Sequence, residues 1–216
     1  MMALYRDIAP NGLQMELPVG APAQRGWESM DMLWDNYQST TRVSYPVIAV
    51  ADNGEAAVLE QIDPVAPGGE PHFSIHSYVF RDGELLVRYF AQSPKPHPTA
   101  LATRGFLVEQ SNLWNEGDKE GFFQAYERFT PAGFDIEFPI GTPPNPGQQM
   151  LEQLWQGYQA DVKLRYRYLF VTDSNEAAIS VGNERVVDGQ ISVNNSLEFY
   201  SFDDAGMHVR YFHEGH

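Results

Sequence analysis

The stretch GLQMELPVG at residues 12–20 recurs as GFDIEFPIG at residues 133–141, which is 121 positions further along the chain. The likeness extends without gaps from Gly12–Gln38 to Gly133–Gln159, where ten of 27 positions are identical. A repeat of this length indicates two fused copies of one domain rather than a solenoid. The identical pairs are Gly12/Gly133, Glu16/Glu137, Pro18/Pro139, Gly20/Gly141, Pro22/Pro143, Gly26/Gly147, Leu33/Leu154, Trp34/Trp155, Tyr37/Tyr158 and Gln38/Gln159.

The same offset continues into the later part of each copy. After one inserted residue, Val87–Phe90 falls on Val209–Phe212. We therefore predict two units, residues 1–93 and 99–216, joined by the proline-rich linker Gln92–Pro98. The further matches are Tyr45/Tyr166, Val50/Val171, Asp52/Asp173 and Glu55–Ala57 on Glu176–Ala178.

The two copies are not equally complete at their beginnings. The second copy carries a helical stretch, Ala100–Trp114, then a break at Asn115–Asp118 and a second helical stretch, Lys119–Phe129. Met1 aligns with Phe122, so the first copy lacks the first helix and most of the second. Either the true start lies further upstream, or this copy is built without that helix.

Composition narrows the classes of function. Apolar residues make up 43% of the 216 positions, which is enough for a folded core. The net charge of −15, with only 14 scattered Lys and Arg, argues against nucleic acid and against an anionic membrane surface. There are no cysteines, so disulfides, a thiolate nucleophile and Cys-ligated zinc are excluded. The chain begins without a signal-peptide pattern and has no apolar run of membrane-spanning length, so we expect a soluble cytoplasmic protein.

A short strand and a helix follow the break in the second copy. Phe134–Phe138 alternates and is closed by Pro139, while Asn145-Pro146 has the pattern of a helix cap followed by proline at the first helical position. The next apolar residues recur at helical spacing and form one aromatic stripe, which fits either a core or the wall of a ligand pocket. This stripe contains Leu151, Leu154, Trp155 and Tyr158 in the second copy and Met30, Leu33, Trp34 and Tyr37 in the first.

The remaining part of each copy has the period of strands. In the second copy, Leu164, Tyr166, Tyr168 and Phe170 alternate with two arginines, which predicts that these four share one face. Asp82-Gly83 and Asp188-Gly189 are strong hairpin signals. The order of elements predicts an α+β fold, with a curved antiparallel sheet and helices on one face.

These features together resemble a known superfamily. The pattern Gly-x-x-x-Glu-x-Pro-x-Gly, the break at Asn115–Asp118 and the last hairpin at Phe80–Phe90 are similar to the nuclear transport factor 2-like superfamily, in particular its SnoaL-like polyketide cyclase and ketosteroid isomerase branch. His72–Ser77 also resembles a strand of phenazine-biosynthesis A/B-type proteins. The resemblance implies two tandem cone-shaped α+β barrels with mostly apolar pockets, proton transfer by a carboxylate or His, and no metal or cofactor. Because such units pair through their sheets, it also implies an intrachain pseudo-dimer, with further homo-oligomers still open.

The resemblance assigns roles to individual positions. Ketosteroid isomerases place a general-base Asp where this chain has Phe138 and Leu17, so that form of the chemistry is excluded. The adjacent Glu137 and Glu16 should point to the opposite face as solvated or backbone-bonded groups. Gln110 falls near the position of a pocket Tyr on the first helix.

The oxyanion-binding position of those isomerases holds Glu198 in one copy and His76 in the other. A carboxyl buried among apolar residues has a raised pKa suited to proton transfer. Alternatively, Glu198 forms a salt bridge with Arg210 or Arg165, and His76 is a satisfied interior histidine. A metal site of His72 and His76 is disfavoured because no acidic partner lies nearby in sequence.

Two other positions on the last strand bear on the chemistry. Arg88 and Arg210 either clamp a carboxylate ligand or remain solvated. Phenazine-type proteins have a functional Glu where this chain has Tyr89 and Tyr211, which argues against phenazine chemistry.

We therefore expect a cofactor-independent isomerase, cyclase, dehydratase or lyase that acts on a small apolar or cyclic molecule. Glu198 is the expected acid/base, and His76 is its counterpart in the first copy. The alternatives are a non-catalytic ligand-binding module and a protein-interaction scaffold. The side chains expected to contact the ligand are Gln110, Tyr126, Phe138, Trp155, Tyr166 and Tyr200 in the second copy, with Tyr78 and Trp34 in the first.

Overall fold

The computed structural model describes residues 2–91 and 97–214. The predicted linker, Gln92–Pro98, lies for the most part outside the described residues. The division into units at residues 1–93 and 99–216 therefore stays a prediction.

The first copy forms a six-stranded sheet in the order β2-β1-β6-β5-β4-β3. Neighbouring strands are antiparallel except for the parallel pair of β1 and β6. Its helices are α1 (Met2–Ile8) and α2 (Glu28–Tyr37). The strands are β1 (Gly12–Glu16), β2 (Gln24–Arg25), β3 (Thr41–Val50), β4 (Ala56–Pro64), β5 (His72–Arg81) and β6 (Glu84–Phe90).

The second copy repeats this sheet in the order β8-β7-β12-β11-β10-β9. Three helices accompany it, α3 (Pro98–Glu116), α4 (Lys119–Phe129) and α5 (Gly147–Tyr158). The strands are β7 (Phe134–Glu137), β8 (Asn145–Pro146), β9 (Val162–Val171), β10 (Ala177–Val187), β11 (Gln190–Asp203) and β12 (Gly206–His213).

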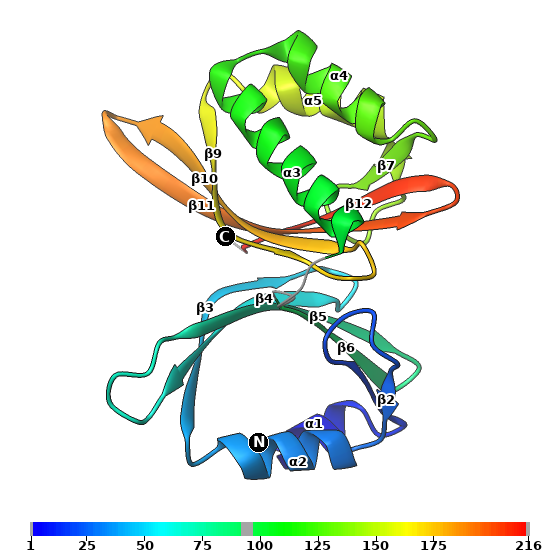
Figure 1. The fold of residues 1–216 in the computed structure, drawn as a ribbon, viewed down its shortest axis with the longest axis vertical. Helices are drawn as coiled ribbons and strands as arrows, with labels where there is room; N and C mark the ends of the chain where they lie inside the picture. The colour runs from blue at the N-terminus through cyan, green and yellow to red at the C-terminus, as the bar shows by residue number, and fades with distance from the viewer. Residues whose placement is uncertain (1, 92–96, 215–216) are drawn as a thin grey trace.

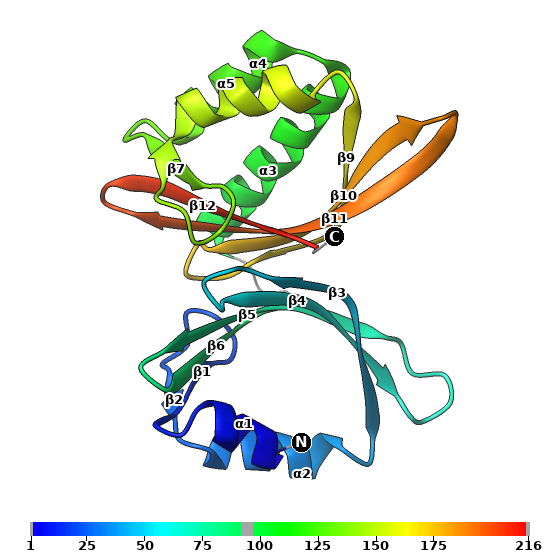
Figure 2. The ribbon, with the colours of Figure 1, turned by 180° about the vertical axis from the view of Figure 1, so that it is seen from behind.

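The two curved sheets pack against each other through their convex faces, and the helices of each copy lie on the outer, concave side (Figures 1 and 2). The expected fold class is confirmed: two tandem α+β cones are packed as an intrachain pseudo-dimer. Apolar side chains from both copies fill the contact, among them Val47, Leu59, Ile75, Phe90, Phe170, Leu197, Phe199 and Phe212.

The helical part of the second copy follows the sequence prediction closely. Gly117 adopts a left-handed φ of 78° and ends α3, because a residue without a Cβ takes this conformation at little cost. The Asp118 side chain accepts a hydrogen bond from the Gly121 amide and so caps α4. The break predicted at Asn115–Asp118 is therefore confirmed as the junction between two helices.

The predicted helix cap at Asn145-Pro146 is wrong. These two residues form the short strand β8, in which Asn145 pairs with Ile136, and α5 begins one residue later at Gly147. Pro146 is the N-cap residue and makes no side-chain hydrogen bond. Pairing with β7 thus places Asn145 and Pro146 in a strand, although their sequence is typical of a helix cap.

The prediction that Leu164, Tyr166, Tyr168 and Phe170 share one face is also wrong. A β-bulge at Arg167 shifts the register, since Tyr166 pairs with Val181 and Tyr168 pairs with the adjacent Ser180. The extra residue reverses the faces beyond it. Leu164 and Tyr166 therefore face the second cone, whereas Tyr168 and Phe170 face the first copy.

Ion pairs join the two copies reciprocally. Arg88 binds Glu16 of its own copy at 2.9 Å and Glu176 of the other copy at 2.8 Å. Arg210 binds Glu137 at 2.6 Å and Glu55 across the contact at 2.7 Å. Each arginine and each glutamate matches its counterpart in the repeat. The arginines are thus neither solvated nor a ligand clamp, and Glu16 and Glu137 hold them in place.

Two repeated glycines lie in the same contact. A Cβ at Gly20 would lie 2.8 Å from the Ser174 side chain, and a Cβ at Gly141 would lie 3.2 Å from the Asn53 side chain. Ser174 and Asn53 are again equivalent positions. The close approach of the two copies explains why both retain glycine at the end of the shared motif.

Candidate functional site

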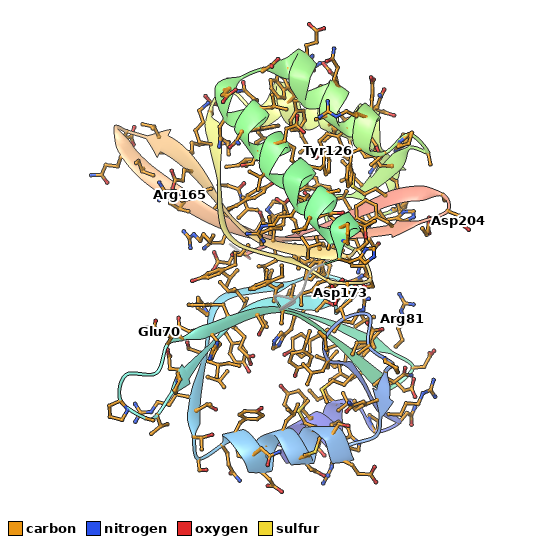
Figure 3. All side chains as sticks on the ribbon, viewed as in Figure 1. Glu70, Arg81, Tyr126, Arg165, Asp173 and Asp204 are labelled. Atoms are coloured by element: carbon orange, nitrogen blue, oxygen red, sulfur yellow. The ribbon has the colours of Figure 1, made fainter. Side chains whose placement is uncertain are left out.

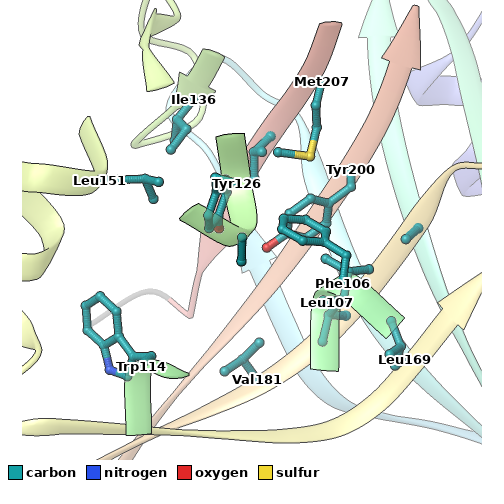
Figure 4. Packing of buried hydrophobic residues seen from close by; sticks show 14 of the residues in the cluster. Phe106, Leu107, Trp114, Tyr126, Ile136, Leu151, Leu169, Val181, Tyr200 and Met207 are labelled. Carbon is teal, nitrogen blue, oxygen red and sulfur yellow. The ribbon is translucent and has the colours of Figure 1, made fainter. Parts of the chain in front are cut away.

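The interior of the second cone is a packed mixture of aromatic and aliphatic side chains. Tyr126 of α4 lies inside this cone (Figure 3), and both Tyr126 and Tyr200 of β11 belong to its buried cluster (Figure 4). The surrounding apolar residues include Phe106, Leu107, Trp114, Ile136, Leu151, Leu169, Val181 and Met207.

Glu198 lies on the cone face of β11 in this interior. Its neighbours across the sheet are Ile179 on β10 and Tyr211 on β12. The Tyr200 hydroxyl donates to Oε2 at 2.8 Å, and the Ser196 hydroxyl donates to Oε1 at 3.4 Å. The carboxyl group is buried and, among the described residues, forms no salt bridge with an arginine, which removes the alternative of a surface ion pair.

Burial dominates the electrostatics of this group. It raises the pKa of Glu198 from its ordinary value of 4.5 to about 7, and the hydrogen bonds from Tyr200 and Ser196 offset part of the rise. At neutral pH the carboxyl therefore populates both protonation states, as a group that takes up and returns protons must.

Gln110 connects the tyrosines around Glu198. From α3, its Nε2 donates to the Tyr166 hydroxyl at 2.9 Å and to the Tyr200 hydroxyl at 3.2 Å. Its Oε1 accepts a hydrogen bond from the Tyr126 hydroxyl. Four predicted site residues thus form one buried network that ends at Glu198.

The other residues predicted for the second site lie apart from this network. Phe138 packs edge-on against Tyr211 and His213 at the side of the cone. Trp155 packs against Trp114 and Phe122 among the helices, so it belongs to the core.

The first cone places His76 at the position of Glu198. Its Nε2 lies 2.8 Å from the Ser74 hydroxyl and 3.2 Å from Glu60 Oε2, and its Nδ1 lies 3.3 Å from the Tyr78 hydroxyl. His76 is fully buried, and its ring contacts that of Tyr89 at a centroid distance of 3.9 Å. Trp34, on the outer helix α2, is partly exposed and takes no part in this cluster.

Glu60 was missed by the sequence reasoning. It lies 14 residues before Ser74, on the adjacent strand β4, where the two residues pair directly. The available signal was the alternation of Val58, Glu60 and Ile62, which places one carboxyl on the cone face of an otherwise apolar run. The acidic partner of His76 is therefore brought in by strand pairing and not by nearness in sequence.

Two hollows on the molecular surface lie elsewhere. One, of about 410 Å³, is lined by residues of α4 and by Glu152, and the other, of about 350 Å³, lies between α4, β7 and the start of α5. Neither hollow is lined by a predicted site residue. Glu198 itself is 5% exposed, so side chains of the second cone cover most of it.

Over 2–91 and 97–214, no group of three His, Cys, Asp or Glu side chains is placed to hold a metal ion. None of the helices in this part of the chain is long and apolar enough to cross a membrane.

The architecture of two cones is the one implied by the resemblance to the nuclear transport factor 2-like superfamily. No protein-family description matches the chain. No curated protein matches it either.

Several solved structures are similar to about half of the chain, roughly the length of one unit. SalBIII, an epoxide hydrolase/cyclase-like enzyme of pyran ring formation in salinomycin, is 16% identical with a TM-score of 0.43, covering 52% of this chain and 91% of that one. A Mycobacterium tuberculosis protein in complex with estradiol-17β-hemisuccinate is 17% identical with a TM-score of 0.41, covering 53% and 93%. An epoxide hydrolase from the same organism is 11% identical with a TM-score of 0.38, covering 54% and 83%.

Proposed function

We propose that the second cone is the active site of a cofactor-independent acid/base enzyme that acts on a small apolar or cyclic molecule. The observation that carries this proposal is the Glu198 carboxyl, which is buried among apolar side chains with a pKa of about 7. A group poised between its two protonation states near neutral pH is suited to removing a proton and returning it elsewhere on the same substrate.

The chemistry uses the groups already in contact. Glu198 takes a proton from a C–H bond next to a carbonyl or similar group, so the electron pair of that bond moves into the substrate. The Tyr200 hydroxyl donates a hydrogen bond to the carboxylate and stabilises its negative charge before the proton is transferred. The proton is then returned to another atom of the substrate, which completes an isomerisation and regenerates the carboxylate. Gln110 and the tyrosines bound to it orient the ligand.

Proton transfer can be measured before the natural substrate is identified. A panel of small cyclic and aryl ketones is incubated with the protein in deuterated buffer, and exchange at the carbon next to the carbonyl is followed by NMR. We expect at least one ketone to exchange faster than in buffer alone. Glu198→Gln should lower that enzymatic rate by about 100-fold, the usual contribution of a positioned acid or base.

A matched control separates this effect from the loss of any carboxyl group. Glu116 is exposed at the end of α3, and Glu116→Gln should keep the rate of the unsubstituted protein. Equal rates in Glu198→Gln and Glu116→Gln would contradict the assignment, as would the absence of exchange above buffer for every ketone.

A second candidate function, ligand binding without turnover, is favoured by the packing of side chains around Glu198. In that case a ketone that saturates the protein would undergo no exchange in either variant. Calorimetric titration of the same panel distinguishes the two functions, because it detects binding regardless of turnover.

A further inference from the structure

One wall of the second cone separates a surface hollow from the groups around Glu198. β7 and the adjoining hairpin of β11 and β12 form this wall, the β7 wall (Figure 1). Phe134 and Ile136 of β7 pack in the interior of the cone. Phe134 also lines the hollow of about 350 Å³, and its ring centroid lies 5.0 Å from that of Tyr126. The Tyr126 hydroxyl binds Gln110, so the wall borders the network that ends at Glu198.

The hairpin closes the same wall from the side of the sheet. Phe202 packs edge-on against Phe129 of α4, with ring centroids 5.7 Å apart. The Met207 amide donates to the Gly133 carbonyl oxygen, just before β7, at 3.2 Å. A movement of the hairpin away from β7 therefore opens the wall between the hollow and the interior.

His208 connects the two parts of the wall on its outer side. It lies on β12 opposite Asp135 of β7, the residue between Phe134 and Ile136. Its Nδ1 lies 2.7 Å from Asp135 Oδ2, and its Nε2 lies 3.1 Å from Asp203 Oδ2 at the end of β11. One imidazole ring thus joins a carboxylate of β7 to a carboxylate of the hairpin.

These contacts fit the cationic form of His208. An ionised carboxylate accepts hydrogen bonds and donates none, so a ring that binds a carboxylate through each nitrogen needs a proton on both. The Ala205 amide and His208 hold the pKa of Asp203 below its usual value, which favours the ionised form. Partial burial lowers the pKa of His208, but its hydrogen bonds to Asp203 and Asp135 outweigh this effect and raise the pKa above the ordinary 6.5.

Other charged groups lie on the strands around His208. Arg210, two residues further along β12, is bound by Glu137 at 2.6 Å and by Glu55 at 2.7 Å. Asp204 lies in the exposed turn at the tip of the hairpin (Figure 3). The charges that raise the pKa of His208 are those of its two bound carboxylates.

The equivalent positions of the first copy hold no histidine. Gln14 of that copy binds Glu84 at 3.1 Å instead. The contact that titrates near neutral pH therefore belongs to the cone that contains Glu198. The residues equivalent to Asp135, His208 and Asp203 are Gln14, Leu86 and Arg81.

We propose that His208 is a pH-sensitive clasp that controls access to the second cone. As a cation it holds the hairpin to β7 and keeps the β7 wall closed. As a neutral ring it has one N–H and donates to only one of the two carboxylates, so the wall loosens beside Tyr126. Because the pKa is raised by folding, the clasp is fully formed below about pH 6.5 and is lost as pH rises through the higher pKa of the folded chain. Such access serves Glu198 only if the second cone has the proposed function, on which this role of the clasp rests.

Access can be measured by labelling a buried thiol, because the chain has no cysteine of its own. Val209→Cys places one thiol inside the cone, between Ile136 of β7 and Tyr200 of β11. Its rate of reaction with methyl methanethiosulfonate is measured with and without His208→Gln, at pH 6 and at pH 9. The ratio of the two rates at one pH cancels the ionisation of the thiol itself.

We expect His208→Gln to speed labelling about fivefold at pH 6, the effect of two partly exposed ion pairs. At pH 9 the two rates should be nearly equal, because His208 is then neutral. Asp203→Asn, which keeps the acceptor for the Ala205 amide, should speed labelling about threefold at pH 6. The matched control is His72→Gln, which removes an exposed histidine of the first copy and should leave the rate unchanged at both pH values.

Three results would overturn the proposal. Neither His208→Gln nor Asp203→Asn speeds labelling at pH 6, or the ratio for His208→Gln is the same at pH 6 and pH 9. In the third, a thiol from Ala178→Cys, buried in the contact between the copies, is accelerated equally, which would show an effect on the whole fold. Labelling requires no turnover. A working clasp without ketone exchange therefore contradicts only the proposed enzyme, and ketone exchange without pH-dependent labelling contradicts only the clasp.

Discussion

At the scale of single residues, the burial of Glu198 has a cost in free energy. Its pKa of about 7 lies well above the ordinary 4.5, so the folded chain binds this proton more tightly than the unfolded chain does. A difference of that size corresponds to roughly 3 kcal/mol between the two protonation states. The ionised form destabilises the fold, and the protonated form does not.

This cost predicts how stability depends on pH. Below about pH 4.5 the group is protonated in the folded and the unfolded chain and does not destabilise the fold. As pH rises from there through about 7, the unfolded chain releases the proton more readily than the folded chain, so stability falls. Relative to Glu198→Gln, the unsubstituted protein should lose on the order of 3 kcal/mol between pH 4.5 and pH 8. Urea unfolding of both proteins across this range measures the difference. A constant difference would show that Glu198 does not titrate in this window.

The sequence located some of these residues and not others. Glu198 and His76 could be predicted because the resemblance assigns a functional position to this strand, and the repeat carries that position to both copies. Gln110 was found only through the resemblance, and its role as the link between three tyrosines depends on how α3 lies over the sheet. Glu60 could not be paired with His76 in advance, since strand register, not sequence distance, brings the two together.

At the scale of elements, β3 and β9 are the same strand in two environments. Four equivalent side chains are exposed on β3 and covered by α3 on β9. Among the described residues, the same apolar pattern therefore occurs with and without a covering helix.

The contrast can be measured by one substitution at each of two equivalent positions. Leu169→Ala removes a buried side chain beneath α3 and should cost about 2 to 5 kcal/mol. Ile48→Ala, at the half-exposed equivalent position, should cost less than about 1 kcal/mol. Both values come from urea unfolding. Similar costs at the two positions would show that β3 is covered in solution.

Local signals predicted these elements to different degrees. The hairpins at Asp82-Gly83 and Asp188-Gly189 are confirmed, with Asp φ angles of 52° and 50° that suit tight turns. The bulge at Arg167 could not be read from alternation, because an extra residue in one strand is defined only by the strand that pairs with it. The apolar–polar alternation of residues 164–170 therefore predicted a strand correctly but placed Tyr168 and Phe170 on the wrong face of the sheet.

At the scale of the whole molecule, the contact between the cones rests on apolar packing with two reciprocal ion pairs beside it. The Glu55 side chain is buried and depends on Arg210, its cationic partner from the other copy. Removing the cationic partner of a buried carboxylate lowers the free energy of unfolding more than breaking a surface ion pair does. The buried charge is left without a partner, because no water replaces the lost contact.

Removing each arginine in turn tests this difference. Arg210→Met leaves Glu55 and Glu137 without their cation and should cost about 2 to 3 kcal/mol, less than for a fully buried pair because Arg210 is partly exposed. Arg128→Met breaks the exposed pair with Glu109 and should stay within about 0.5 kcal/mol. Urea titration of the two variants gives the free energies of unfolding to be compared. Equal effects would mean that the contact does not depend on its ion pairs.

The reciprocity of the contact has a consequence for the history of the chain. The residues that hold the copies together lie on the convex faces, whereas the residues that distinguish the cones, such as Glu60 and Glu198, lie on the concave ones. Selection can therefore act on the two surfaces separately. After the duplication, either interior was able to acquire new residues without weakening the contact between the copies.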